Sequence, residues 1–233
     1  MSVVNRLVPR PFSVLGILKS LASLHQWHAL RLFGLAQLDW SASRRARRAV
    51  AWGRPVPWWS YGCTSFVDQV ISPQKSVLDI GSGASTLWWL ERGNQVVALE
   101  SNPKWGEEVS EIARQDGFEL ELSVGLLSDL VSNLIESRPV PFDVVCIDNE
   151  GDRFPIVEAV LPLVAETGVI IFDNIDRTRY STERELLASH GFGELTFHGL
   201  GPVSAFAWST SVFFRSRWLN LEGRAHPCCV VDY

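Results

Sequence analysis

The sequence predicts an α/β protein in which a doubly wound, mostly parallel sheet carries helices on both faces, with a helical extension at the N-terminus. From residue 76 onward, short apolar runs alternate with helical segments of about 10–15 residues, which is the pattern of a parallel sheet. The first apolar run ends in a glycine-rich turn. The chain of 233 residues is 46% hydrophobic and 20% charged, which excludes a disordered chain, a collagen-like chain and a small disulfide scaffold.

The first part of the chain differs in pattern from the rest. Apolar residues recur at helical spacing over 12–38, which predicts one or two helices. An arginine cluster at 44–48 follows, and the glycine and prolines of 53–57 predict a loop. We therefore expect a helical extension over residues 1–55 and a core domain over residues 56–233.

Strands and helices then alternate along the core domain. The expected strands are 77–80, 95–99, 118–124, 142–147, 168–172, 195–198 and 210–214. The expected helices are 85–92, 103–115, 126–137, 154–165 and 182–190. Gly93 and Asn94 stop the first helix, and Pro103 suits the first turn of the second.

A glycine turn follows the first strand of the core. Asp79, Gly81 and Gly83 lie between this strand and its helix, where glycines let the backbone approach a ligand and the helix offers free N–H groups. Glu100 ends the next strand, and a carboxylate there can accept hydrogen bonds from both hydroxyls of a ribose. Ligands of such sheets bind at the carboxyl ends of the strands. The sequence therefore predicts a cofactor that contains a nucleoside.

Two features of the turn favour S-adenosylmethionine over NAD. A dinucleotide fingerprint has a third glycine where this chain has Thr86. Asp79 suits a cationic amino group better than a pyrophosphate. The alternatives are an NAD-type oxidoreductase and a membrane-associated or scaffold protein that keeps a vestigial cofactor site.

Two segments resemble motifs of class I S-adenosylmethionine-dependent methyltransferases. The first is Val77-Leu78-Asp79-Ile80-Gly81-Ser82-Gly83, and the second is Val97-Ala98-Leu99-Glu100. Residues 55–61, 199–202 and 210–215 are similar to a group of small bacterial methyltransferases without a defined substrate. The resemblance implies a Rossmann-like sheet of seven strands whose last strand is antiparallel.

The same resemblance implies roles for individual residues. It places Asp79 near the methionine amino group, Glu100 on the ribose, and Ser101 and Asn102 near the adenine. The candidate cofactor-binding residues are Asp79, Gly81, Ser82, Gly83, Ser85, Thr86, Glu100, Ser101, Asn102 and Asp148.

Acidic residues also end the fourth and fifth strands. Asp148 follows the fourth, while Asp173 and Asn174 follow the fifth, and three such oxygen ligands suit Mg²⁺. The arrangement resembles catechol-type O-methyltransferases, although Gly151 stands where that family has a lysine. The alternative is that the two aspartates cap helices or bind nearby arginines.

Asp148 and Arg153 are the candidate catalytic residues. Arg153 stays protonated and cannot act as a base, so we expect it to bind a carboxylate or phosphate of the acceptor. Trp59 and Tyr61 are expected to line the acceptor pocket, because aromatic rings supply apolar walls with polar handles. The alternative is that this region packs on the sheet as part of the core.

Charge and cysteine content limit the partners and the compartment that we expect. Residues 1–60 hold nine basic residues and one acid, whereas the remainder holds 12 basic and 25 acidic residues. The basic extension predicts peripheral contact with a membrane surface, and the acidic core argues against nucleic acid. Four cysteines without regular spacing and the lack of a clear signal-peptide cleavage site predict a cytoplasmic protein. We expect O-methylation of a small molecule or a glycan.

Overall fold

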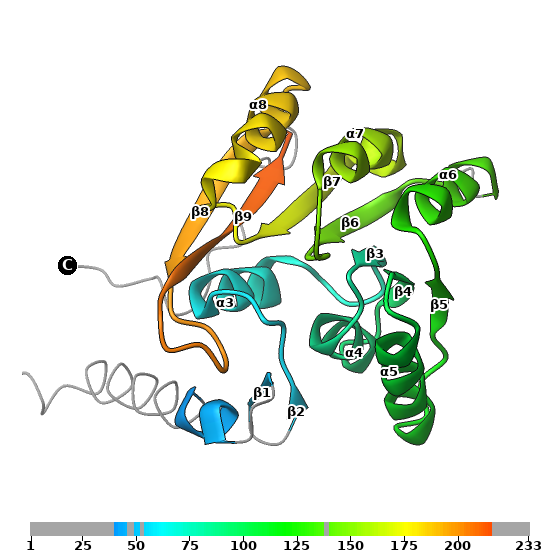
Figure 1. The fold of residues 1–233 in the computed structure, drawn as a ribbon, viewed down its shortest axis with the longest axis vertical. Helices are drawn as coiled ribbons and strands as arrows, with labels where there is room; N and C mark the ends of the chain where they lie inside the picture. Colours follow the sequence, from blue (N-terminus) through cyan, green and yellow to red (C-terminus); the bar gives the residue numbers. More distant parts are fainter. Residues whose placement is uncertain (1–39, 46–48, 52–53, 138–139, 216–233) are drawn as a thin grey trace, which may run out of the picture.

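A seven-stranded sheet forms the centre of the computed structural model, which describes residues 40–45, 49–51, 54–137 and 140–215 (Figure 1). In sheet order the strands are β5 (Glu121–Val124), β4 (Gln95–Glu100), β3 (Ser76–Ile80), β6 (Phe142–Ile147), β7 (Val164–Asp173), β9 (Trp208–Phe214) and β8 (Gly193–Gly199). The pairs from β5 to β7 are parallel, and β9 runs antiparallel to both β7 and β8. The seven strands and the antiparallel last strand are therefore confirmed.

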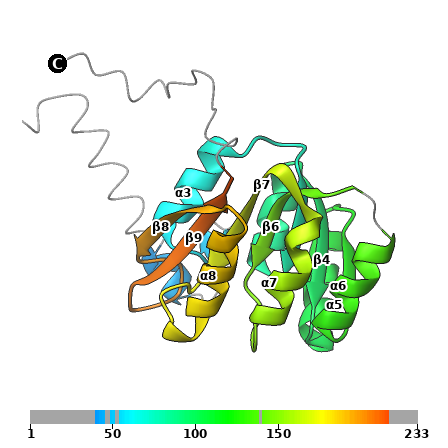
Figure 2. The ribbon, with the colours of Figure 1, turned by 90° about the horizontal axis from the view of Figure 1, so that it is seen from above.

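The helices cover the two faces of this sheet in two groups of three (Figure 1). One face carries α3 (Tyr61–Val70), α4 (Ala84–Glu91) and α5 (Pro103–Gln115). The other carries α6 (Leu127–Ser137), α7 (Phe154–Val160) and α8 (Ser181–Ser189), the layer nearest the viewer in Figure 2. Each face has its own apolar core, which is the doubly wound arrangement that the sequence predicts.

Alternating side chains divide each strand between these two cores. In β3, Leu78 and Ile80 pack in the core of α6, α7 and α8, whereas Val77 packs in the core of α3, α4 and α5. Asp79 shares the face of Val77 and is fully buried. The sheet therefore directs this acid toward the α4 side.

Two boundaries differ from the sequence prediction. The helix predicted over 154–165 ends at Val160 and continues as a 3₁₀ turn, Leu161–Leu163, after which β7 begins. Pro162 lacks the N–H that another α-helical turn would need. The strand predicted over 118–124 begins only at Glu121. At the first of these boundaries β7 therefore begins four residues before the predicted strand of 168–172. The helix α3 was not predicted from the sequence. The remaining core boundaries lie within two residues of the predicted ones.

The described part of the N-terminal extension lies against the connection between β8 and β9. Residues 40–45 are helical, and the Trp40 indole N–H donates to the Ser204 carbonyl at 2.9 Å. The Ser43 hydroxyl accepts the Val203 N–H at 3.0 Å. Farther along, β1 (Val50–Ala51) pairs with β2 (Arg54–Pro55).

The predicted helices of residues 12–38 lie outside the described residues, and the domain boundary at residue 55 stays a prediction. Among the described helices, none combines the length and the apolar character that crossing a bilayer requires.

Gly201→Ala should destabilise the protein. Gly201 lies so close to the start of α3 that an added Cβ would overlap the Trp59 carbonyl oxygen and the Trp208 ring. Overpacking of this kind costs about 1–3 kcal/mol, which urea unfolding would measure. Gly199→Ala is the matched control, because its Cβ would meet no atom within 4 Å. Equal stability of the two variants would contradict the close packing at Gly201.

Candidate active site

The carboxyl ends of four neighbouring strands carry acidic side chains on one face of the sheet. Register places Asp79 of β3 in one row with Ala98 of β4 and Cys146 of β6. Side chains two residues apart share a face, so the next row toward the carboxyl ends faces the same helices. By this register, the next row consists of Gly81, Glu100, Asp148 and Asp173. The sheet thus brings together the glycine turn and the acids predicted from the sequence.

Asp79 is buried with only half of its carboxylate satisfied. Its Oδ2 atom accepts hydrogen bonds from the Ser85 and Thr86 hydroxyls at 2.8 and 2.6 Å, and both residues lie in the first turn of α4. Its Oδ1 atom is buried and has no hydrogen-bond partner among the residues that the structure describes. Burial raises the pKa of Asp79 to about 6, although the two hydroxyls oppose the shift. An unpartnered buried carboxylate oxygen is suited to a cationic group of a ligand.

Gly81 occupies a position that no other residue fits. Its φ of +94° is in the left-handed region, and an added Cβ would lie 2.7 Å from the Asp148 carbonyl carbon and oxygen. The absence of a side chain lets the backbone of Asp148 pack directly against the turn. Gly83 continues the turn, and its N–H donates to the Thr86 hydroxyl at 2.9 Å.

Glu100 is held by the residues that follow it. Its Oε1 atom accepts the N–H groups of Ser101 and Asn102, both at 2.8 Å. Its Oε2 atom accepts only the Ser82 hydroxyl, at 3.2 Å. Ser101 and Asn102 are exposed, and Asn102 also caps α5. The backbone therefore fixes one carboxylate oxygen and leaves the other available to hydroxyl donors.

Trp105 is a residue of this turn that sequence reasoning missed. It lies in the first turn of α5, and its indole N–H donates to the Ser82 carbonyl at 2.6 Å. Its ring lies 3.7 Å from where a Cβ on Gly83 would be. No motif marks this tryptophan, because its contact depends on how α5 packs beside α4.

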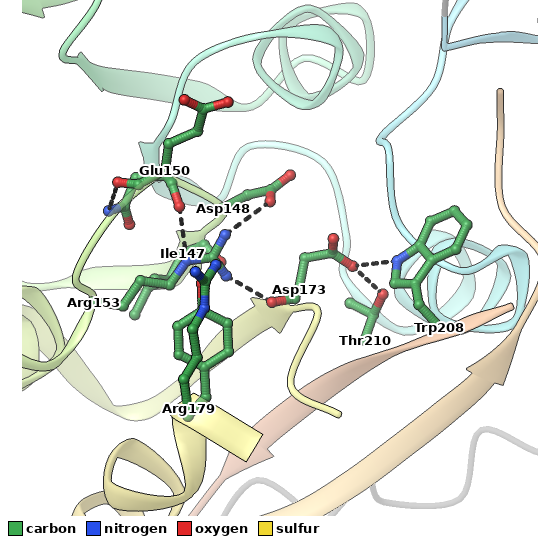
Figure 3. A network of polar contacts seen from close by, with 10 residues as sticks. Ile147, Asp148, Glu150, Arg153, Asp173, Arg179, Trp208 and Thr210 are labelled. Carbon is green, nitrogen blue, oxygen red and sulfur yellow. Dashed lines mark hydrogen bonds and ion pairs between the residues drawn. The ribbon is translucent and has the colours of Figure 1, made fainter. Parts of the chain in front are cut away.

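Arg153 cross-links the ends of β6 and β7 (Figure 3). Its guanidinium donates to the carbonyls of Asn149 at 2.8 Å and Asp173 at 2.6 Å, and it pairs with Asp148 Oδ1 at 3.3 Å. It packs over the rings of Phe172 and Tyr180. The Arg153 side chain is only 3% exposed. The structure thus differs from the expected contact with an acceptor, because this cation is committed to positioning the strand ends.

Asp148 and Asp173 both lie beside the guanidinium of this arginine (Figure 3). Burial raises the pKa of Asp148 to about 6, against the opposing charge of Arg153. Burial also raises the pKa of Asp173 well above its usual range, and the charge of Asp148 adds to the effect. The Oδ1 atom of Asp173 accepts hydrogen bonds from the Trp208 indole at 2.9 Å and from the Thr210 hydroxyl. These two partners on β9 were also missed by sequence reasoning.

Two oxygens of the predicted magnesium set, Asp148, Asp173 and Asn174, already have partners, and the set stays a prediction. The Arg153 cation already pairs with Asp148, and one oxygen of Asp173 already accepts two hydrogen bonds. Within the residues that the structure describes, no three His, Cys, Asp or Glu side chains gather as metal ligands. The guanidinium supplies the positive charge at this place.

The two aromatic residues predicted to bind an acceptor have different environments. Trp59 is fully buried and packs against Trp88 and Trp89, with ring centroids 6.2 Å away in both cases. It is therefore a core residue, and the predicted place of Trp59 in an acceptor pocket is wrong because α4 covers it. Tyr61 is the first residue of α3, and its side chain is partly buried. The backbone N–H of Tyr61 donates to the Leu200 carbonyl at 2.8 Å.

Comparison with known proteins identifies the fold. No family model and no curated protein matches the sequence, but solved structures do. An O-methyltransferase from Bacillus cereus in complex with SAH is 20% identical with a TM-score of 0.57, covering 91% of this chain and 94% of its own. The O-methyltransferase TomG from Streptomyces achromogenes, in complex with SAM, is 19% identical with a TM-score of 0.54, covering 60% and 73%. The chain has the fold of the class I methyltransferases.

A third similar structure extends this result. A methyltransferase from Geobacter sulfurreducens is 14% identical with a TM-score of 0.52 and covers 91% of this chain and 93% of its own. The methyltransferase fold agrees with the strand order around β3 and with Thr86 in place of a third turn glycine. The nicotinamide alternative is therefore not favoured.

Asp79→Asn should change how stability depends on pH. Burial raises the pKa of Asp79 from 3.8 to about 6, so the folded chain holds a proton that the unfolded chain releases in this range. The contribution of this proton to the free energy of unfolding is fully present below about pH 4, and it is lost as the pH rises through about 6. We expect Asp79→Asn to be more stable than the native chain by up to about 3 kcal/mol at neutral pH, with the two converging near pH 4.

Urea unfolding across this pH range measures the difference. Asp116→Asn, at an exposed acid that follows α5, is the control and should track the native chain. A constant stability difference between Asp79→Asn and the native chain at all pH values would refute the buried, ionisable carboxyl.

Proposed function

We propose that the protein is an S-adenosylmethionine-dependent methyltransferase that acts at oxygen on a small molecule or a glycan. The observation that carries the proposal is the unpartnered Oδ1 atom of Asp79, buried beside the Gly81 turn and one row below Glu100. The similar structures named as O-methyltransferases, with SAM or SAH bound, support the same chemistry.

The residues of the turn fit this cofactor. The Oδ1 atom of Asp79 accepts the methionine amino group, which gives the buried carboxylate its missing partner. Gly81, with its φ of +94°, gives the turn a backbone conformation that other residues rarely adopt. The Oε2 atom of Glu100 accepts a ribose hydroxyl, while its Oε1 atom stays fixed by backbone N–H groups. Exposed Ser101 and Asn102 border the adenine.

Asp148 is the proposed acceptor of the proton released in the reaction. When bound, S-adenosylmethionine would supply a methyl group carried on a sulfonium sulfur. The acceptor oxygen displaces this sulfur from the methyl carbon in line. The Asp148 side chain is 24% exposed, so an acceptor hydroxyl can reach it. Its pKa of about 6 leaves it ionised at neutral pH but more basic than an ordinary carboxylate. Arg153 holds the carboxylate in place through Oδ1.

Glu100→Gln should weaken cofactor binding by about 10- to 100-fold. Glutamine can keep one accepting oxygen for the backbone but puts an NH₂ group where a ribose hydroxyl must donate, and hydrogen bonds to charged groups are worth about 1.5–3 kcal/mol. Calorimetric titration with S-adenosylmethionine measures the change. Glu91→Gln, an exposed acid at the other end of α4, is the control and should bind normally.

A native chain that binds no S-adenosylmethionine at millimolar concentration would refute the proposed function. It would leave the alternative of a scaffold with a vestigial site.

The proposed reaction does not use Mg²⁺, since Arg153 already pairs with Asp148. Mn²⁺ is a paramagnetic substitute for Mg²⁺, and its free concentration can be followed by electron paramagnetic resonance. We expect the concentration of free Mn²⁺ to be the same with the protein as in buffer alone. The measurement is made with and without S-adenosylmethionine. Mn²⁺ retention by the native chain that disappears in Asp173→Asn would show that a metal site exists here.

A further inference from the structure

Three large apolar side chains are exposed on two segments that meet at the carboxyl edge of the sheet, and we call them the apolar rim. They are Trp58 at 46%, Leu200 at 36% and Phe206 at 70% exposure. The segments that carry them are in contact, because the Leu200 carbonyl accepts the Tyr61 N–H and Gly201 packs on the Trp59 carbonyl. Exposed apolar side chains on adjoining segments are suited to interaction with an apolar partner.

The apolar rim is directly connected to the acidic strand ends. The Phe206 ring stacks edge-on against Trp208, with ring centroids 6.3 Å apart. Trp208 in turn donates its indole N–H to Asp173. Since β8 is parallel to β7, the connection from β8 to β9 lies at the same edge as the glycine turn. Whatever covers the rim also lies over the candidate active site.

Positive charge is concentrated beside this rim. Arg44 and Arg45 are exposed in the helical segment that bonds to the β8–β9 connection through Trp40 and Ser204. Arg44 lies over the Trp40 ring, 5.0 Å from its centroid. Residues 1–60 hold nine basic residues and one acid, whereas the rest of the chain is acidic. An anionic surface is therefore attracted to the two exposed arginines of this segment.

We propose that the apolar rim and the adjacent arginines dock on an anionic lipid bilayer. Tryptophan and phenylalanine at the water–lipid boundary beside basic residues are the combination that binds such a surface. The acidic core domain disfavours a nucleic acid. Together with the proposed methyltransferase function, on which this last step rests, docking presents the active-site edge to lipid-embedded or lipid-linked acceptors.

Flotation of the full chain with vesicles tests the docking without cofactor. We expect the chain to float with vesicles containing phosphatidylglycerol and not with vesicles of phosphatidylcholine alone, and added salt should release it. Phe206→Ser should lower partition about tenfold. Ile135→Ser is the matched control, because Ile135 is an exposed apolar residue of α6 remote from the rim, and it should not change partition. Replacing Arg44 and Arg45 by alanine should lower partition about 25-fold.

Three results would overturn the docking proposal. The first is equal flotation with neutral and anionic vesicles, and the second is an equal effect of Phe206→Ser and Ile135→Ser. The third is a dimer, seen by light scattering, that Phe206→Ser dissociates, because the rim would then bind a second copy of the chain. Calorimetry with S-adenosylmethionine on the same samples separates these results from a failure of the proposed function.

Discussion

The register of the parallel strands is the constraint on which the candidate active site depends. Because β3, β4, β6 and β7 are aligned, every second residue at their carboxyl ends faces the side of α3, α4 and α5. Asp79 and the row that contains Glu100, Asp148 and Asp173 are thereby collected on one face. Gly81 interrupts the row, and the missing side chain lets the Asp148 backbone pack against the turn. A shift of one residue in any strand would turn its acid to the opposite core.

The acids collected in this way are costly to bury, and the surrounding residues limit that cost. Burial raises the pKa of Asp79, Asp148 and Asp173. Hydroxyl and indole groups satisfy some of the oxygens, and Arg153 supplies one buried positive charge. One oxygen of Asp79 stays without a partner. Sites that retain such unfavourable features in the ligand-free protein are commonly those that gain stability when a ligand binds.

The N-terminal region and the β8–β9 connection complete the carboxyl edge. Contacts from Trp40 and Ser43 to this connection, and from Tyr61 to Leu200, join segments that are far apart in the chain. They set the apolar rim beside Asp173 through Trp208. The basic N-terminal region and the acidic core domain are therefore in contact at the edge where the proposed cofactor and acceptor would bind.

The sequence by itself determined the fold class, most element boundaries, the glycine turn and the acids at the strand ends. These features depend on local patterns: two-residue and helical periodicity, and turn residues next to buried strands. Tertiary structure alone decided the burial of Trp59, the inward commitment of Arg153, and the contacts of Trp105 and Trp208. Such contacts join residues distant in sequence, and their partners follow from how helices and strands pack. Periodicity indicates that a side chain is buried, but only the packed layers decide what it touches.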